Sequence, residues 1–405
     1  MKSKLNTASN ETRVMPAHER KAAISLASIY GLRMLGMFLL LPIFAIYAET
    51  LEGGESHTMI GMAMGAYGIM QVLLQLPFGI ASDKLGRKPV IYFGLVLFII
   101  GSVIAAMAGD IVTMIIGRSI QGAGAISAVV TALVADLTSD EHRTKAMAMI
   151  GATIGVTFAI SLVLGPLLSA WIGVSGIFWM TAMLCVLAAL VVKFIVPDPQ
   201  QMQEKSTVKM RDILSNTQLL RLNFGSFALH AAQIAMFLVV PFALQDAGHM
   251  PQNQHWQVYL PVLLLSFALM VPAIIVGEKR GKLKLIMVGA VALMLVAQLM
   301  LMSYINSFWG VVVSLLVYFV AFNILEASLP SLVSKIAPPA AKGMAMGVHN
   351  TAQSLGMALG AVAAGYISQH YGQSQVFVFC ACLIALWLVF AFSMQAPPQK
   401  ASANE

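Results

Sequence analysis

The sequence predicts an all-α integral membrane protein in which twelve transmembrane helices form two pseudo-symmetric six-helix bundles. Of its 405 residues, 59% are hydrophobic and only 10% are charged, whereas soluble domains carry about 25% charged residues. The apolar residues fall into long runs, and the two halves of the chain resemble each other. Lipid is therefore the main solvent of this chain, where helices can satisfy their own backbone hydrogen bonds.

Twelve apolar runs are long enough to cross a bilayer, which takes about 20 residues of α-helix. The first run follows a basic tail and is too long for the apolar core of a signal peptide, so we expect it to remain as a span. Short connections make sequential helices antiparallel neighbours. The runs cover about residues 22–48, 58–81, 89–108, 111–136, 145–171, 176–196, 218–245, 257–277, 284–304, 308–334, 343–369 and 374–394.

The longest polar interruption lies between the sixth and seventh runs and opens with Pro-Asp-Pro-Gln. It divides the chain into two sets of six runs. The predicted parts are an N-terminal cytoplasmic tail (1–21), an N-terminal six-helix bundle (22–196), a cytoplasmic linker (197–217), a C-terminal six-helix bundle (218–394) and a C-terminal cytoplasmic tail (395–405).

Two short patterns recur in the same order in both halves. Met-Phe-Leu-Leu-Leu-Pro at residues 37–42 returns as Met-Phe-Leu-Val-Val-Pro at 236–241. Lys-Ala-Met-Ala-Met at 145–149 returns as Lys-Gly-Met-Ala-Met at 342–346. Because the two offsets are nearly equal, they indicate an internal duplication. Parallel six-helix repeats of this kind place a substrate site near the membrane midplane, between the halves.

Positive charge marks one side of the predicted membrane protein. All but two of the 24 Lys and Arg residues lie in the tails, in the linker or in connections on that side. The positive-inside rule therefore places both termini in the cytoplasm, and we expect a bacterial inner membrane location. The net charge of +7 reflects this topology and does not indicate nucleic-acid binding. The opposite connections carry the acidic residues Glu49, Glu52, Glu55, Asp110 and Asp246.

A charged turn between the second and third runs carries the motif Gly79-x3-Asp83-x2-Gly86-Arg87-Lys88. A glycine in the turn permits a backbone conformation that other residues avoid. The motif resembles the loop 2–3 signature of the major facilitator superfamily. That resemblance implies the superfamily's twelve-helix fold and secondary transport of small molecules by alternating access.

We expect this turn to act as a conformational latch at the cytoplasmic end of the helices. Asp83 would meet the N-terminus of the eleventh span when the cytoplasmic side is closed, because a helix N-terminus favours an anion. Arg87 would meet Asp136, at the end of the fourth run. The predicted latch residues are Gly79, Asp83, Gly86, Arg87, Lys88, Asp136 and Arg143.

A second motif in the fourth run, Arg118-x2-Gln121-Gly122-x-Gly124-Ala125, resembles the span 4 motif of the same superfamily. The resemblance implies that Arg118 takes part in proton coupling through a neighbouring acid. A purely structural arginine is the alternative, since a charge inside the membrane needs a partner or a water-filled cavity.

A third motif lies in the fifth run, where Gly165 and Pro166 follow Gly151 and Gly155. It resembles the span 5 motif of drug:proton antiporters. The match is incomplete, because Ser and Ala stand at positions 169 and 170, where that motif ends in two glycines. The resemblance thus implies antiport less firmly than it implies transport.

Within this group, the chain is most similar to YajR-type transporters. The similarity is carried by Arg-Met-Leu-Gly-Met-Phe at residues 33–38 and Phe-Val-Ala-Phe-Asn at 319–323, and it extends over all twelve runs. Such transporters can carry a small soluble domain after the last span. We expect none here, because the sequence ends at Glu405.

Three ionisable residues inside apolar runs are the main candidates for chemistry. Arg33 lies near mid-depth of the first run, where we expect it to bind an anionic group or to tune a nearby carboxylate; a structural ion pair is the alternative. Glu326 is the one carboxylate well inside a run of the second half. Burial favours its protonated form and a facing Arg33 or Arg118 its charged form. It is therefore our expected proton carrier, unless it forms a fixed salt bridge.

Polar side chains share helix faces in three other runs. His230 lies on one face with Gln233, and His349 lies on another with Gln353. Each histidine is a candidate proton relay, and a hydrogen-bonded core histidine is the alternative. A stripe on the second run either contacts substrate or joins helices. The predicted substrate-cavity residues are Arg33, Tyr67, Gln71, Gln75, Gln121, Gln233, Asn323, Glu326, Asn350 and Gln353.

The expected function is proton-coupled antiport that exports drug-like or amphipathic small molecules. A proton-coupled symporter and a metabolite exporter on the same fold stay open, as does a membrane sensor that transports nothing. Motifs for metalloprotease, phosphate-loop and serine-hydrolase chemistry are absent from the sequence, so we expect no enzyme, cofactor or metal. The expected partners are substrate, protons and the lipid bilayer, and we expect a monomer.

Overall fold

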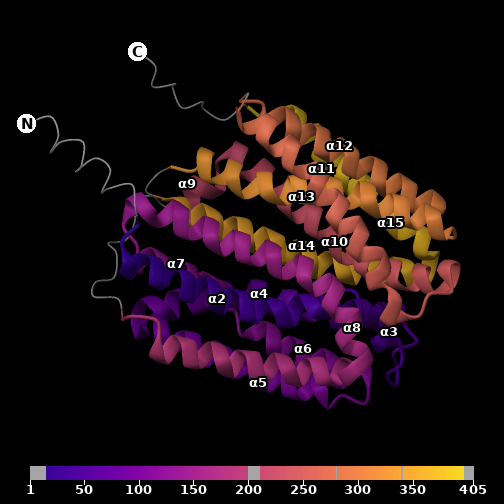
Figure 1. The fold of residues 1–405 in the computed structure, drawn as a ribbon, viewed down its shortest axis with the longest axis horizontal. Coiled ribbons are helices and arrows are strands. Elements are labelled where there is room, and N and C mark those ends of the chain that lie inside the picture. The colour runs from indigo at the N-terminus through magenta and orange to yellow at the C-terminus, as the bar shows by residue number, and fades with distance from the viewer. Residues whose placement is uncertain (1–14, 199–209, 280, 339–340, 396–405) are drawn as a thin grey trace, which may run out of the picture.

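The computed structural model describes residues 15–198, 210–279, 281–338 and 341–395. Helices make up this part of the chain and no strand occurs in it. Figure 1 shows the helices of the first half, indigo to magenta, below those of the second half, orange to yellow. The first half contains α2 (Ala17–Leu40), α3 (Phe44–Glu49), α4 (His57–Leu85), α5 (Arg87–Ala106), α6 (Ile111–Ala123), α7 (Ser127–Leu137) and α8 (Asp140–Phe194). The second contains α9 (Met210–Leu214), α10 (Thr217–Gly248), η1 (Gln252–Gln254), α11 (Trp256–Lys279), α12 (Leu283–Tyr304), α13 (Phe308–Ile336), α14 (Lys342–Tyr371) and α15 (Gln373–Phe392).

Ten helical segments in these ranges are long and apolar enough to cross a membrane. The twelve predicted runs exceed that number for two reasons. Helix α8 contains both the fifth and the sixth run, which meet at Gly173, where φ is 68°. Helix α14 is the eleventh run, and polar side chains such as His349 and Gln353 lower its mean hydropathy. All twelve runs are therefore helical over most of their length, as predicted.

Two predicted runs are interrupted. The first breaks into α2 and α3 at residues 41–43, around Pro42, which has no backbone N–H to continue the helix. The fourth breaks into α6 and α7 at residues 124–126. A side chain at Gly124 would collide with the carbonyl of Gly94, so the break lets α5 and the fourth run approach closely. The length of the apolar runs in the sequence did not indicate either of these breaks.

The predicted tails and linker lie largely outside the described residues, at 1–14, 199–209 and 396–405. The boundaries of the two predicted bundles therefore stay predictions. Within the described ranges, span α10 is almost wholly buried, whereas α11 exposes most of its apolar side chains. That exposure is the expected pattern for a helix that faces lipid.

The two halves pack against each other where the start of α4 meets the end of α14. Gly61 faces the carbonyl of Ala361, and the backbone of Gly65 faces Ala358. His57 adds polar contacts, because its backbone N–H donates to Gln369 Oε1 at 2.6 Å and its ring Nδ1 lies 2.7 Å from Ser368 Oγ. Small residues thus let the helix backbones touch at this end.

The opposite end of α4 has no such packing. A side chain added at Gly79 would meet no atom within 4 Å. The halves are therefore closed together at the end that carries His57, whereas α4 has open space beside Gly79 at its other end.

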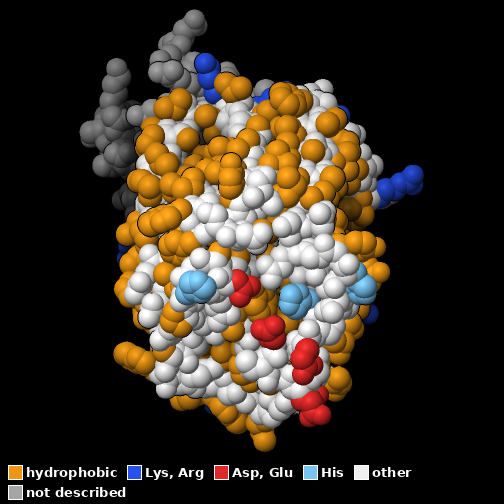
Figure 2. Space-filling view, turned by 90° about the vertical axis from the view of Figure 1, so that its right-hand side faces the viewer, with side chains coloured by type: hydrophobic (Ala, Val, Ile, Leu, Met, Phe, Trp, Pro, Cys, Tyr) orange, Lys and Arg blue, Asp and Glu red, His pale blue; other side chains and the backbone are white. Residues whose placement is uncertain are grey.

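Figure 2 looks onto the closed end, at the right of Figure 1, and shows acidic and histidine side chains gathered on its lower half. Asp110 belongs to the connection before α6, where its carboxylate accepts hydrogen bonds from the side chain and the backbone N–H of Thr113. These bonds hold the pKa of Asp110 below its usual range. The acidic loops predicted for the second side of the membrane thus lie at the end where the halves meet.

We expect Gly61→Ala to destabilise this conformation, because its new Cβ would lie 2.5 Å from the Ala361 carbonyl oxygen and 2.9 Å from Gly365 Cα. Overpacking of this kind costs about 1–3 kcal/mol. Thermal unfolding of purified protein measures the effect, with Gly289→Ala as the control, since Gly289 is exposed and has open space around it. Equal melting temperatures for the two variants would contradict the packing described above.

Candidate functional site

Arg33 on α2 is buried among neutral partners. Its side chain is 2% exposed. One terminal nitrogen donates to Ser127 Oγ and the other to the hydroxyl of Tyr67, each at 2.9 Å. The guanidinium also lies 5.4 Å from the ring centre of Phe98. These contacts hold the cation inside the first half of the protein, and no carboxylate among the described residues lies at ion-pair distance from it.

Arg118 on α6 is held in a similar way. Its NH1 donates to Gln121 Oε1, and Gln121 Nε2 donates to Ser102 Oγ at 2.9 Å. The guanidinium lies over the ring of Tyr67, 4.9 Å from its centre, and 5.6 Å from that of Phe44. Tyr67 therefore lies between two buried arginines, binding one through its hydroxyl and the other through its ring face.

The polar stripe predicted on α4 faces the interior. Gln71 donates to Ser127 Oγ and accepts from Ser354 Oγ of α14, each at 3.5 Å. Gln75, one turn further along α4, is also buried. A polar chain thus runs from Arg33 through Ser127 and Gln71 to the second half of the protein.

The second half contributes a separate cluster around His230 on α10. Its Nδ1 lies 2.9 Å from the backbone carbonyl of Ser226, and its Nε2 lies 2.6 Å from Gln353 Nε2 and 3.4 Å from Glu326 Oε2. The Glu326 side chain is 37% exposed, whereas that of His230 is 3% exposed. A buried imidazole therefore contacts a carboxylate that is partly exposed.

The partner of Glu326 differs from the one expected from the sequence. We expected Arg33 or Arg118 to face it, but neither lies within ion-pair distance of Glu326 in the described part of the chain. Both arginines bind side chains of the first half instead. The sequence places all three residues inside spans, and it does not show which helices adjoin in this conformation.

Four other predicted cavity or relay residues lie on α10, α13 and α14. Asn323 donates to Ser266 Oγ of α11 at 2.9 Å, so here it joins two helices. Gln233 and His349 are buried, and Asn350 is partly buried. Within the described ranges none of these three makes a hydrogen bond to His230, whereas Gln353 does. His349 still lies close enough to His230 for a coulombic interaction.

The residues of the span 5 motif have two different surroundings. A Cβ at Gly165 would collide with the Leu39 carbonyl, and the Pro42 ring lies 3.2 Å from it. Gly165 and the adjoining Pro166 therefore let α8 pack on the break between α2 and α3. Gly151 and Gly155 are exposed and have nothing within 4 Å of an added Cβ.

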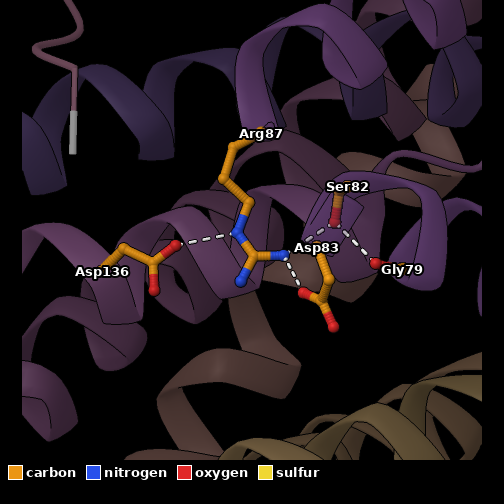
Figure 3. A network of polar contacts seen from close by, with 5 residues as sticks. All are labelled: Gly79, Ser82, Asp83, Arg87 and Asp136. Carbon is orange, nitrogen blue, oxygen red and sulfur yellow. Dashed lines mark hydrogen bonds and ion pairs between the residues drawn. The ribbon is translucent and has the colours of Figure 1, made fainter. Parts of the chain in front are cut away.

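The predicted latch forms a connected set of contacts, drawn in Figure 3. Arg87 Nε donates to Asp136 Oδ2 at 2.8 Å, and its NH1 donates to Asp83 Oδ1 at 2.6 Å. The same NH1 donates to Ser82 Oγ at 2.7 Å, and Ser82 donates to the Gly79 carbonyl at 2.8 Å. The predicted pair of Arg87 and Asp136 is thus present, and Ser82 is a member that sequence reasoning missed.

Three further latch residues lie outside this set. Gly86 has φ of 92°, a conformation that disfavours any residue with a Cβ. Lys88 Nζ lies 2.8 Å from Asp198 Oδ1 in the connection that follows α8. Arg143 lies in the first turn of α8. Asp198 was missed because it stands more than a hundred residues from Lys88 and only folding brings them together.

Comparison with known proteins finds one family over nearly the whole chain. A model of the Major Facilitator Superfamily matches residues 26–361 and 224–405. The chain is 43% identical to the inner membrane transport protein YajR of Escherichia coli over 97% of this chain and 87% of YajR. It is 24% identical to the quinolone resistance protein NorA of Staphylococcus aureus over 85% of this chain and 89% of NorA.

A solved structure shares the fold. The crystal structure of a bacterial homolog of the human lysosomal transporter Spinster, in an inward-facing and occupied conformation, superposes with a TM-score of 0.74. The alignment covers 94% of this chain and 97% of that chain at 12% identity.

We expect Asp136→Asn to destabilise the fold by about 3 kcal/mol, because it leaves the partly buried Arg87 without its buried partner. The Asp136 side chain is 2% exposed, whereas that of Asp83 is 43% exposed. Asp83→Asn should therefore cost less than about 1 kcal/mol. Chemical or thermal unfolding in detergent compares the two variants, and a larger loss for Asp83→Asn would reverse our ranking of the two ion pairs.

Proposed function

The chain belongs to the Major Facilitator Superfamily and is a multi-pass membrane transporter, and we propose that it exchanges protons for drug-like or amphipathic small molecules that it exports. The observation that carries the proposal is the contact between His230 and Glu326. We propose a bacterial inner membrane location with both termini in the cytoplasm and a monomer as the working unit. The predicted halves, 22–196 and 218–394, are then the two bodies that rock around the site.

The geometry around His230 supports one shared proton. A backbone carbonyl can only accept a hydrogen bond. Because Nδ1 of His230 lies next to the Ser226 carbonyl, Nδ1 carries the hydrogen of the neutral imidazole. In a neutral imidazole, Nε2 then has no hydrogen to give to Glu326 and accepts one from Gln353 Nε2, 2.6 Å away. The contact of Nε2 with Glu326 Oε2 at 3.4 Å becomes a hydrogen bond when a further proton reaches His230 and the Gln353 amide turns its oxygen toward Nε2. We propose that this pair carries the coupled proton.

The predicted topology indicates which side of the membrane the closed end of the protein faces. The end closed by His57 and Gly61 carries the acidic loops, which the positive-inside rule assigns to the outside. The end at Gly79 is then cytoplasmic, and the conformation is open inward. Substrate would enter from the cytoplasm in this state, which suits an exporter.

Export of drug-like molecules is supported by two likenesses. NorA, a quinolone resistance protein by name, is related along most of the chain. The span 5 motif resembles that of drug:proton antiporters, and its Gly165 packs on the break between α2 and α3. Symport on the same fold predicts substrate movement in the same direction as protons.

We expect purified protein in liposomes to take up the quinolone norfloxacin when the lumen is more acidic than the outside, because outward proton flow drives inward drug flow in an antiporter. Glu326→Gln should lower this flux about ten-fold or more, since one protonatable group of the pair is lost. Glu49→Gln, which changes an exposed carboxylate at the closed end, is the matched control. Unchanged flux in Glu326→Gln would reject the proton site, and uptake driven by the opposite gradient would indicate symport.

For the turn that contains Asp83, we propose a latch that favours the outward-open state. Arg87 holds Asp83 at the cytoplasmic end of α4. When the halves close there, Asp83 would reach the N-terminus of α14, which begins at Lys342 and attracts an anion. The ion pairs of Arg87 with Asp83 and Asp136 would then be present in both the inward-open and the outward-open state. Only the contact of Asp83 with α14 would differ between the two states.

Asp83→Asn should therefore shift the population toward the inward-open state and slow transport, while ligand binding persists. Distances between spin labels placed on the cytoplasmic ends of α4 and α14 measure the shift. Populations equal to those of the unaltered protein would exclude a latch at this position.

A further inference from the structure

We propose that Arg33, Tyr67 and Ser127 form a subsite that binds the anionic group, such as a carboxylate, of the transported molecule. The proposal rests on the transport function above and narrows its substrate class to amphipathic organic anions, including zwitterions. It goes beyond the expectation from Arg33 alone, because it assigns two hydroxyl donors and a contact to the second half.

The first argument is charge. Arg33 and Arg118 are both buried, and both face Tyr67. No carboxylate lies within ion-pair distance of either arginine among the described residues, and Glu326 contacts His230 instead. Two cations near one ring in a water-poor interior are costly without a counter-charge. A ligand anion supplies that charge, whereas a cationic ligand would add to the repulsion.

The second argument is a count of hydrogen-bond donors. Ser127 Oγ accepts from Arg33 and from Gln71, and the Tyr67 hydroxyl accepts from Arg33. Each hydroxyl also has one hydrogen to donate, and within the described ranges no hydrogen bond uses it. Arg33 Nε is buried and also lacks an acceptor. Three donors therefore lack acceptors, and a carboxylate is a group that only accepts.

The third argument is the surroundings of Arg33. A narrow hollow adjoins the guanidinium. Apolar side chains make up half of its lining and suit the hydrocarbon part of an amphipathic molecule. The hollow is too narrow for a water molecule in this conformation, so an anion enters only when the helices around it move. Its lining residues are Ile29, Tyr30, Arg33, Ile126, Ser127 and Val130.

The contact of Gln71 with both Ser127 and Ser354 links this subsite to the other half. An anion that accepts the hydrogen of Ser127 leaves the oxygen lone pairs to Arg33 and Gln71. It would therefore bind beside the polar chain that joins α4 to α14, without breaking the contact of Gln71 with Ser354.

The test compares two ligands of the same shape, 2-naphthoate and its neutral amide 2-naphthamide, by calorimetry on the purified full-length protein. We expect the unaltered protein to bind the carboxylate at least about ten-fold more tightly, the gain typical of a charge-assisted hydrogen bond. Ser127→Ala and Tyr67→Phe should each reduce this ratio several-fold, since each removes one donor and keeps every charge. Arg33→Gln should abolish the preference.

The control is Ser314→Ala, because Ser314 is buried and its hydroxyl already donates to the Gly310 carbonyl within α13. A ratio of affinities is insensitive to a general loss of stability, so a purely structural role of Ser127 or Tyr67 would leave it unchanged. Equal affinity for the two ligands, or failure of both to bind, overturns the subsite. If the protein transports norfloxacin but binds the carboxylate and the amide equally well, the subsite is overturned and the proposed function stands. If it prefers the carboxylate but shows no proton-driven flux, the subsite is supported and the proposed function is overturned.

Discussion

A charge buried in the membrane interior must find its partners within the protein, and this constraint organises the structure. Arg33 and Arg118 find their partners among hydroxyl, amide and aromatic groups. His230 and Glu326 contact each other. Because water is scarce there, each arrangement is sensitive to any proton or anion that enters. The same constraint positions the side chains of the proposed proton and anion sites.

Helix packing determines where that response can be transmitted. At the closed end, glycines on α4 let its backbone touch α14, and Gln71 reaches across to Ser354 near the middle of the same pair. At the other end, Gly79 has open space and the ion pairs of Arg87 stay within one half. One pair of helices thus carries the closed contact, the polar chain to Arg33 and the proposed latch.

The individual spans could be read from the sequence because lipid imposes a minimum apolar length on each. The breaks at Pro42 and Gly124 were less visible. They follow from close contacts with α8 and α5, which depend on the tertiary arrangement. The pairing of Arg87 with Asp136 was within reach of sequence reasoning, since both ends lie on the same predicted side. The roles of Ser82 and Ser127 were not, because an isolated serine carries no sequence signal.

By itself, the sequence determined the membrane class, the helical spans, their two similar halves and the ionisable residues within them, because hydropathy and the cost of buried charge act locally. Only the tertiary structure decided the partners: His230 for Glu326, neutral hydroxyls for Arg33, and Tyr67 shared between two arginines. The physical reason is that such contacts depend on which helix faces adjoin in a given conformation. That relation changes as the halves move, whereas the sequence stays the same.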